Sequence, residues 1–282
     1  MKYCWGEFIS SVTKQSQFQE HRKLTLDEFE AIQSVHKIAE SFLKDLDYLL
    51  MINEHYTLLN RSVEKALENR NAKSILELRA GARSVSMNFL NLIGLVRIMK
   101  DHLRVSLDKH SRTIFERIWS RFYDNYFEFR FFERLRNYSQ HQMLPISDFW
   151  TEESKSQPLK VIVHMDRDTL LQSKYWSSVK TEIEAMEQKI DVLPMLKEYI
   201  LQVNMFFSDY LEIHRPDLTR TYIYQLIDFG FMKKNTSGGH YGLFVIQELP
   251  PGPESGLRIN IHNPHFEYIE LLPKYLPNIE LT

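Results

Sequence analysis

A long stretch without proline or glycine, from Leu26 to about Glu68, constrains the fold of this chain more than any other feature. Within it, apolar side chains recur at the three- and four-residue spacing of one helix face. They are Phe29, Ile32, Val35, Ile38, Phe42, Leu46, Leu49 and Leu50. Thr25 followed by Glu28 matches the capping box, in which two residues satisfy each other's backbone N–H groups. The sequence therefore predicts one long helix that begins at this pair.

A second helix is predicted from about Ala72 to Ser106, and Gly81 and Gly94 fall inside it. Its apolar stripe consists of Ile75, Leu78, Ala82, Val85, Phe89, Leu92, Leu95 and Met99. Only nine glycines serve the 282 residues, which suits long helices better than a turn-rich β fold. We therefore expect a mainly α protein.

A third helix is predicted to start near Ser111 and to run past Leu135. Pro145 disfavours a helical backbone at Leu144 and must end it, so His141 lies in or just beyond the last turn. The stripe of this helix is largely aromatic: Ile114, Phe115, Ile118, Trp119, Phe122, Tyr126, Phe129, Phe132 and Leu135.

Further aromatic residues lie outside this stripe. Tyr123, Phe127 and Phe131 make the third helix hydrophobic over more of its circumference than one buried face needs. Two explanations remain open. The aromatic residues form one large core, or the helix packs both on its own bundle and on a second copy of the chain.

The composition changes after Pro145, so we expect a helical domain over residues 1–145 and a C-terminal α+β region over 146–282. Alternating apolar residues predict a strand from Leu159 to His164. Three more helices are predicted: a short one after Asp166 and Asp168, one from Val179 to about His214 with Pro194 as an interruption or a restart, and one from Pro216 to Ile227.

Near the C-terminus, β-rich runs at Tyr241–Glu248 and Leu257–His262 flank a loop rich in proline and glycine. This pattern predicts a hairpin over about residues 241–262. Together with Leu159–His164, the hairpin is expected to form a small three-stranded sheet beside the helices.

Charge and composition restrict the function classes. A net charge of −2 gives no global argument for nucleic-acid binding, so such a ligand would need a local basic site. The single cysteine, Cys4, and an N-terminus without an apolar run favour a reducing cytoplasm. The longest apolar stretch, near Phe89–Val96, is too short for a membrane span. Neither a glycine-rich phosphate loop nor a complete set of metal ligands is present, so no cofactor and no metal are expected.

The best candidate for chemistry is the hexapeptide Arg136-Asn137-Tyr138-Ser139-Gln140-His141. A guanidinium can hold a phosphate while an imidazole moves a proton. An ideal helix places Arg136 and His141 about 140° apart around the axis and about 7.5 Å apart along it, so they are not automatic neighbours. A symmetric dimer can bring two such pairs into one cleft. Asn137 and His141 share a helix face.

Arg136 continues a helix face that buries aromatic residues one turn earlier. Because an uncompensated charge there is costly, it either pairs with an acid such as Glu133 or Glu128 or lines a wet cleft.

The segment from Phe131 to His141 resembles the signature of the HEPN superfamily, whose ribonucleases carry an Arg, a polar residue and, after a short spacer, a His. The resemblance spans about residues 25–145. It implies an up-and-down four-helix bundle that dimerises with its motifs facing each other. It also implies that Arg136 contacts phosphate, that His141 transfers protons and that Asn137 supports them.

The function implied is a metal-independent endoribonuclease that cleaves single-stranded or loop RNA to 2′,3′-cyclic phosphate ends, in prokaryotic defence or a toxin–antitoxin system. Tyr138 is expected to stack on an unpaired base, and Arg134 and Arg130 to contact phosphates. The expected partners are RNA, a second copy bound through the aromatic helices, and an antitoxin or regulatory protein. The alternatives are a non-catalytic HEPN-like module that binds a nucleotide, RNA or a protein, and a structural adaptor with Arg136 in an internal salt bridge.

Overall fold

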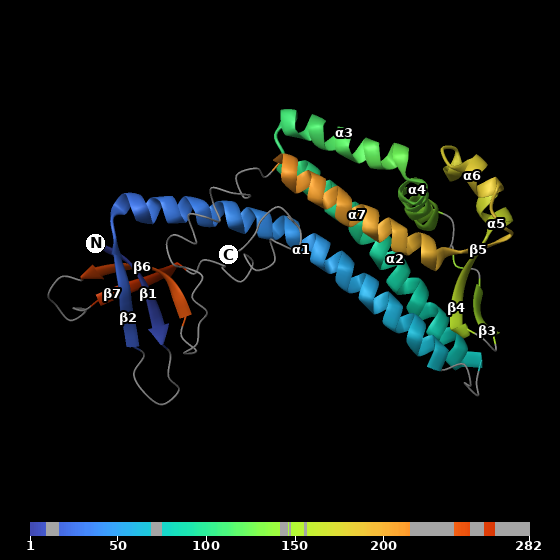
Figure 1. Cartoon of the computed structure of the whole chain (residues 1–282), viewed down its shortest axis with the longest axis horizontal. Helices are drawn as coiled ribbons and strands as arrows, with labels where there is room; N and C mark the ends of the chain where they lie inside the picture. Colours follow the sequence, from blue (N-terminus) through green and yellow to red (C-terminus); the bar gives the residue numbers. More distant parts are fainter. Residues whose placement is uncertain are drawn as a thin grey trace. The chain divides into compact units, whose positions relative to one another are not determined.

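The computed structural model describes residues 1–9, 17–68, 75–141, 146, 148–154, 157–214, 240–248 and 257–262. These residues are mainly helical, with short antiparallel strands, as the sequence predicts (Figure 1). None of the described helices is long and apolar enough to cross a membrane.

Contacts divide the chain into two units. One is Asp45–His214, and the other combines Met1–Lys44 with Arg215–Thr282. Helix α1 (Leu26–Glu68) contributes to both. The domain border predicted at residue 145 stays a prediction. The Asp45–His214 unit extends past that residue.

Helix α1 has the predicted bounds and begins at the predicted capping box. The backbone N–H of Thr25 donates to Glu28 Oε2 at 2.8 Å, and that of Glu28 donates to Thr25 Oγ1 at 3.2 Å. These hydrogen bonds and the nearby Arg22 guanidinium keep the pKa of Glu28 below its usual value. A local sequence pattern was sufficient here because both partners belong to the same helix turn.

Helix α2 (Ile75–Ser106) ends where predicted, and its predicted first turn lies outside the described residues. It packs against α1 through polar contacts: Asn88 Nδ2 donates to Ser62 Oγ at 2.7 Å. Gly81 lies at the same interface, where a Cβ would stand 3.6 Å from the side chain of Ala66. The α2 core residues include Val85, Phe89, Leu92, Val96 and Met99.

The predicted third helix is two helices, α3 (Lys109–Asn125) and α4 (Phe127–His141). Tyr126 between them is extended, with φ −116° and ψ 121°. The prediction of one continuous helix was therefore wrong, since neither a proline nor a glycine marks the break.

An arginine explains why this break is stable. Arg130 Nη1 donates to the carbonyl oxygens of Tyr123 at 3.0 Å and of Asp124 at 2.6 Å. Both carbonyls belong to the last turn of α3, which has no helical partners for them. The guanidinium thus caps α3 from the first turn of α4.

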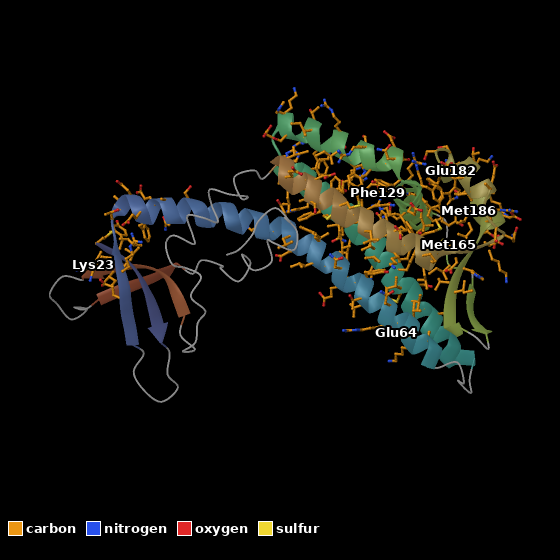
Figure 2. The ribbon with its side chains drawn as sticks, viewed as in Figure 1. Lys23, Glu64, Phe129, Met165, Glu182 and Met186 are labelled. Atoms are coloured by element: carbon orange, nitrogen blue, oxygen red, sulfur yellow. The ribbon has the colours of Figure 1, made fainter. Side chains whose placement is uncertain are left out.

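Helix α7 (Val192–His214) completes this bundle by packing on α3 and α4. Pro194 lies in its first turn, where a missing N–H is tolerated, so of the two predicted alternatives the helix restarts at this proline. Aromatic rings dominate the core between the three helices: Phe115, Trp119, Phe122, Phe129, Phe132, Tyr199, Phe206 and Tyr210. Figure 2 shows Phe129 within this packed part.

A small sheet and short helices follow α4 in sequence. The sheet has the order β3-β4-β5, from strands Asp148–Ser154, Gln157–Asp166 and Lys189–Asp191. Strand β4 contains the predicted strand. Helices α5 (Arg167–Leu171), η2 (Lys174–Trp176) and α6 (Lys180–Glu184) come between β4 and β5.

The predicted C-terminal hairpin is present as β6 (His240–Glu248) and β7 (Leu257–His262). The prediction that this hairpin forms a sheet with the Leu159–His164 strand was wrong. The hairpin belongs to a sheet of order β2-β1-β6-β7, whereas β4 belongs to the sheet β3-β4-β5. Strands β1 (Lys2–Ile9) and β2 (Gln17–Leu24) come from an N-terminal hairpin that the sequence analysis missed. Pairing between β1 and β6 joins the two ends of the chain, which no local pattern reveals. The helix predicted between Pro216 and Ile227 lies outside the described residues.

Candidate functional site

The predicted hexapeptide forms the last turns of α4. Leu135 and Tyr138 are buried and fix this end of the helix against the rest of the bundle. Around the helix axis, Arg136 and His141 lie at the two edges of a polar strip. Between them stand Asn137, which is half-buried, and Gln140, which is exposed.

Arg136 is half-buried and only partly hydrogen-bonded. Its Nη1 donates to Asn137 Oδ1 at 3.1 Å. Its Nε is buried and has no hydrogen-bond partner among the described residues. Of the two acids considered as partners, Glu128 accepts from Gln202 Nε2 at 3.1 Å, whereas Glu133 interacts electrostatically with Arg136.

Glu133 lies between α4 and α2 with a side chain that is 13% exposed. Burial raises its pKa, while the cations Lys100, Arg97 and Arg136 act in the opposite direction. Arg97 Nη1 stands 3.9 Å from Glu133 Oε2. Three basic side chains therefore surround one buried carboxyl group.

Lys100, the second α2 cation, is held by an aromatic ring. Its Nζ lies 4.2 Å from the centroid of the Trp119 ring, a cation–π contact. Burial lowers its pKa. Sequence reasoning missed Lys100 and Arg97 because they are far from the hexapeptide in sequence, and only the packing of α2 on α4 brings them close.

His141 is exposed, and its ring stacks on Tyr175 of η2 with centroids 5.5 Å apart and an interplanar angle of 14°. This contact lies on the side of α4 that faces η2, whereas Arg136 lies about 140° away around the helix axis. The structure therefore orients each group but does not bring the two together within one chain. Tyr175 is a third residue of the site that the sequence did not reveal, after Lys100 and Arg97.

Tyr138 does not take the predicted role. Its side chain is 3% exposed and packs beside Trp176, with ring centroids 5.4 Å apart. Burial also raises the pKa of its hydroxyl group. A ring enclosed in this way offers no face to an RNA base, so Tyr138 is a core residue.

Arg130 and Arg134 are also engaged within the chain. Besides capping α3, Arg130 donates from Nη2 to Glu182 Oε1 at 3.0 Å, and its side chain is only 17% exposed. Figure 2 shows Glu182 on α6, beside α4. Arg134 Nε donates to Tyr123 Oη at 2.8 Å and to Ser178 Oγ at 2.9 Å. Both guanidinium groups are thus held by hydrogen bonds within the chain, and their phosphate contacts stay a prediction.

The extra aromatic residues of α3 and α4 find partners in the same chain. Phe131 stacks on Trp176 with centroids 5.5 Å apart, Phe127 lies against Phe131, and the Tyr123 hydroxyl group contacts Ser178. One large core thus accounts for these rings. The excess of aromatic residues therefore gives no argument for the homodimer predicted through these helices. That prediction rests on the Arg136–His141 motif alone.

Within the described ranges, no group of three or more histidine, cysteine, aspartate or glutamate side chains is arranged to hold a metal ion. Neither a family model nor a curated protein nor a solved structure matches the chain. The function must therefore be argued from the geometry of this site.

Proposed function

We propose that the chain is a metal-independent endoribonuclease of the HEPN type, acting on single-stranded or loop RNA in prokaryotic defence or a toxin–antitoxin system. One observation carries the proposal. At the end of a helix anchored in the core, Arg136 keeps an unsatisfied Nε while His141 is exposed nearby. An unsatisfied buried donor of a charged group is costly, and a phosphate oxygen would satisfy it.

In the proposed reaction, the RNA 2′-hydroxyl oxygen attacks the adjacent phosphorus and the bond to the 5′-oxygen breaks. The products are a 2′,3′-cyclic phosphate and a free 5′-hydroxyl end. His141 takes the proton from the attacking 2′-hydroxyl group and delivers it to the leaving 5′-oxygen, and Arg136 stabilises the additional negative charge of the pentacoordinate transition state. Asn137 holds the Arg136 guanidinium through its Oδ1.

A second subunit completes the site in this proposal. Because Arg136 and His141 lie at opposite edges of the polar strip, one phosphate does not readily meet both groups of one chain. A twofold axis near the end of α4 would place the strip of one subunit against that of its partner. Each Arg136 would then face the partner's His141 across the RNA.

The test is incubation of the purified protein with mixed RNA in EDTA, followed by analysis of the product ends. We expect cyclic phosphate ends from the wild type and none from Arg136→Ala or His141→Ala. Arg117→Ala and His110→Ala, which remove exposed residues of the same types on α3, are the matched controls. Equal cleavage by the wild type and both site variants would refute the assignment.

A non-catalytic RNA-binding module is the second candidate. The engagement of Arg130, Arg134 and Tyr138 within the chain favours it, because it leaves fewer groups to position a substrate. RNA binding without any cleavage products in the same experiment would support this module over the nuclease.

A further inference from the structure

The α2–α4 interface contains a charge arrangement that the proposed reaction does not yet use. Glu133 lies 3.9 Å from Nη1 of Arg97 on α2 and interacts electrostatically with Arg136 on its own helix. The two cations stand on different helices, so only the tertiary fold brings them to one carboxyl group. Arg97 is 35% exposed, and a ligand at the surface of the site can reach it.

Other charged groups near Glu133 are already engaged or lie farther out. On α2, Lys100 is held over the Trp119 ring, and Asp101 accepts from Arg97 Nε at 3.0 Å while remaining 51% exposed. On α7, Tyr199 is buried, and burial together with the nearby Glu133 raises the pKa of its phenol. Asp101 is the closer partner of Arg97, but of these two acids Glu133 is the one that interacts with both Arg97 and Arg136.

We propose that Arg97 and Arg136 together bind one phosphodiester group of the RNA, and that Glu133, their counterion in the empty protein, takes up a proton from solvent as the phosphate binds. This inference rests on the proposed function and extends it by naming a substrate-binding residue on α2 and a proton-linked competitor. Arg97 is thereby a phosphate ligand, and Glu133 is a positioning residue.

The physical reason is electrostatic competition. An ionised carboxylate and a phosphodiester close to the same two guanidinium groups repel each other, and the repulsion is strong where water is excluded. Bringing the phosphate close disfavours the charged form of Glu133. Because burial already raises the pKa of Glu133, the binding event needs only a further rise in the same direction.

This coupling has a defined sign. Since the complex binds one more proton than the free protein, RNA affinity increases as the pH falls. A substitution at Glu133 isolates this coupling, because the other ionisable groups are the same in both proteins.

The experiment measures binding of a fluorescent oligouridine with 2′-O-methyl groups, which cannot be cleaved, by anisotropy from pH 5 to pH 8. At pH 7.5 we expect Glu133→Gln to tighten binding about tenfold and to show a flatter pH dependence than the wild type. Glu182→Gln, which makes the same charge change beside Arg130, is the matched control. Equal affinities and equal pH slopes for the wild type and Glu133→Gln would overturn the proton coupling.

A second pair of variants tests the phosphate ligand without altering the buried carboxyl group. Arg97→Gln should weaken binding about tenfold. Arg104→Gln, on the same helix and paired with Glu116 at the surface, should leave binding unchanged. Equal effects of the two α2 variants would overturn the role of Arg97. These outcomes are independent of cleavage: a protein that never cleaves RNA can still show both effects, and a nuclease can lack them.

Discussion

The indole ring of Trp119 on α3 meets the ring of Phe206 on α7 edge-on, with centroids 4.9 Å apart and an interplanar angle of 80°. Phe206 also packs edge-on against Phe115 and Phe122. This one side chain of α7 thus fills the space between three aromatic residues of α3. The bundle that carries the candidate site therefore depends on a helix from the second half of the chain.

Replacement of Phe206 by alanine should lower the free energy of unfolding by about 3–5 kcal/mol, because it opens a cavity in a core of rigid rings. Urea unfolding followed by circular dichroism measures this. The neighbouring Met205, whose side chain is 49% exposed, is the control, and its replacement by alanine should change stability by about 0.5 kcal/mol or less. Similar losses for both variants would contradict the packing described.

Arg130→Gln should destabilise the protein by about 1–3 kcal/mol, since it leaves two α3 carbonyl groups and Glu182 without their donor. RNA binding should be unchanged at temperatures where the variant stays folded. Thermal unfolding and anisotropy titration of the same samples test both points. A loss of RNA binding at full stability would return Arg130 to the role of a phosphate ligand.

Stability should also depend on pH through Glu133. Burial raises the pKa of this group above the usual value of 4.5, so the folded protein binds its proton more tightly than the unfolded chain does. The contribution of Glu133 to stability is therefore lost as the pH rises from about 4.5 through the raised pKa. When the pH is raised from 4.5 to 6 and 7.5, the urea midpoint of Glu133→Gln should increase relative to that of the wild type. A shift in the opposite direction would mean that the surrounding cations outweigh burial.

Tyr175→Ala should reduce the rate of RNA cleavage about tenfold, because the His141 ring loses the surface that holds its orientation. Tyr175→Phe keeps the stacked ring and should retain activity. Single-turnover cleavage assays compare the two variants. If both substitutions slow cleavage equally, the hydroxyl group rather than the stacking is what matters.

Mixing two inactive variants tests the proposed site between subunits. In a dimer of Arg136→Ala with His141→Ala, one of the two sites regains an intact arginine and an intact histidine. With random exchange, we expect about a quarter of the wild-type activity. No activity after exchange, verified by native mass spectrometry, would show that each site uses both groups of one chain.

Several features of the fold follow from neighbours in sequence. The start of α1 at Thr25 and Glu28 was predicted because both capping partners lie within one helix turn. The end of α4 near His141 and the β6–β7 hairpin were predicted from proline and glycine residues close by in the sequence. The break at Tyr126 was not predicted, because its stability depends on the Arg130 side chain, which reaches back across the corner between two helices.

By itself, the sequence determined the periodic elements and singled out Arg136, Asn137 and His141, because helical spacing and residue chemistry are local properties. Only the tertiary structure decided which polar groups are free to act. Arg130, Arg134 and Tyr138 resemble ligand-binding residues in sequence, yet contacts with Glu182, Ser178 and Trp176 engage them within the fold. Likewise, Arg97 joins Arg136 at Glu133 only because α2 packs on α4. Charge and burial depend on distances in space, which local sequence patterns do not specify.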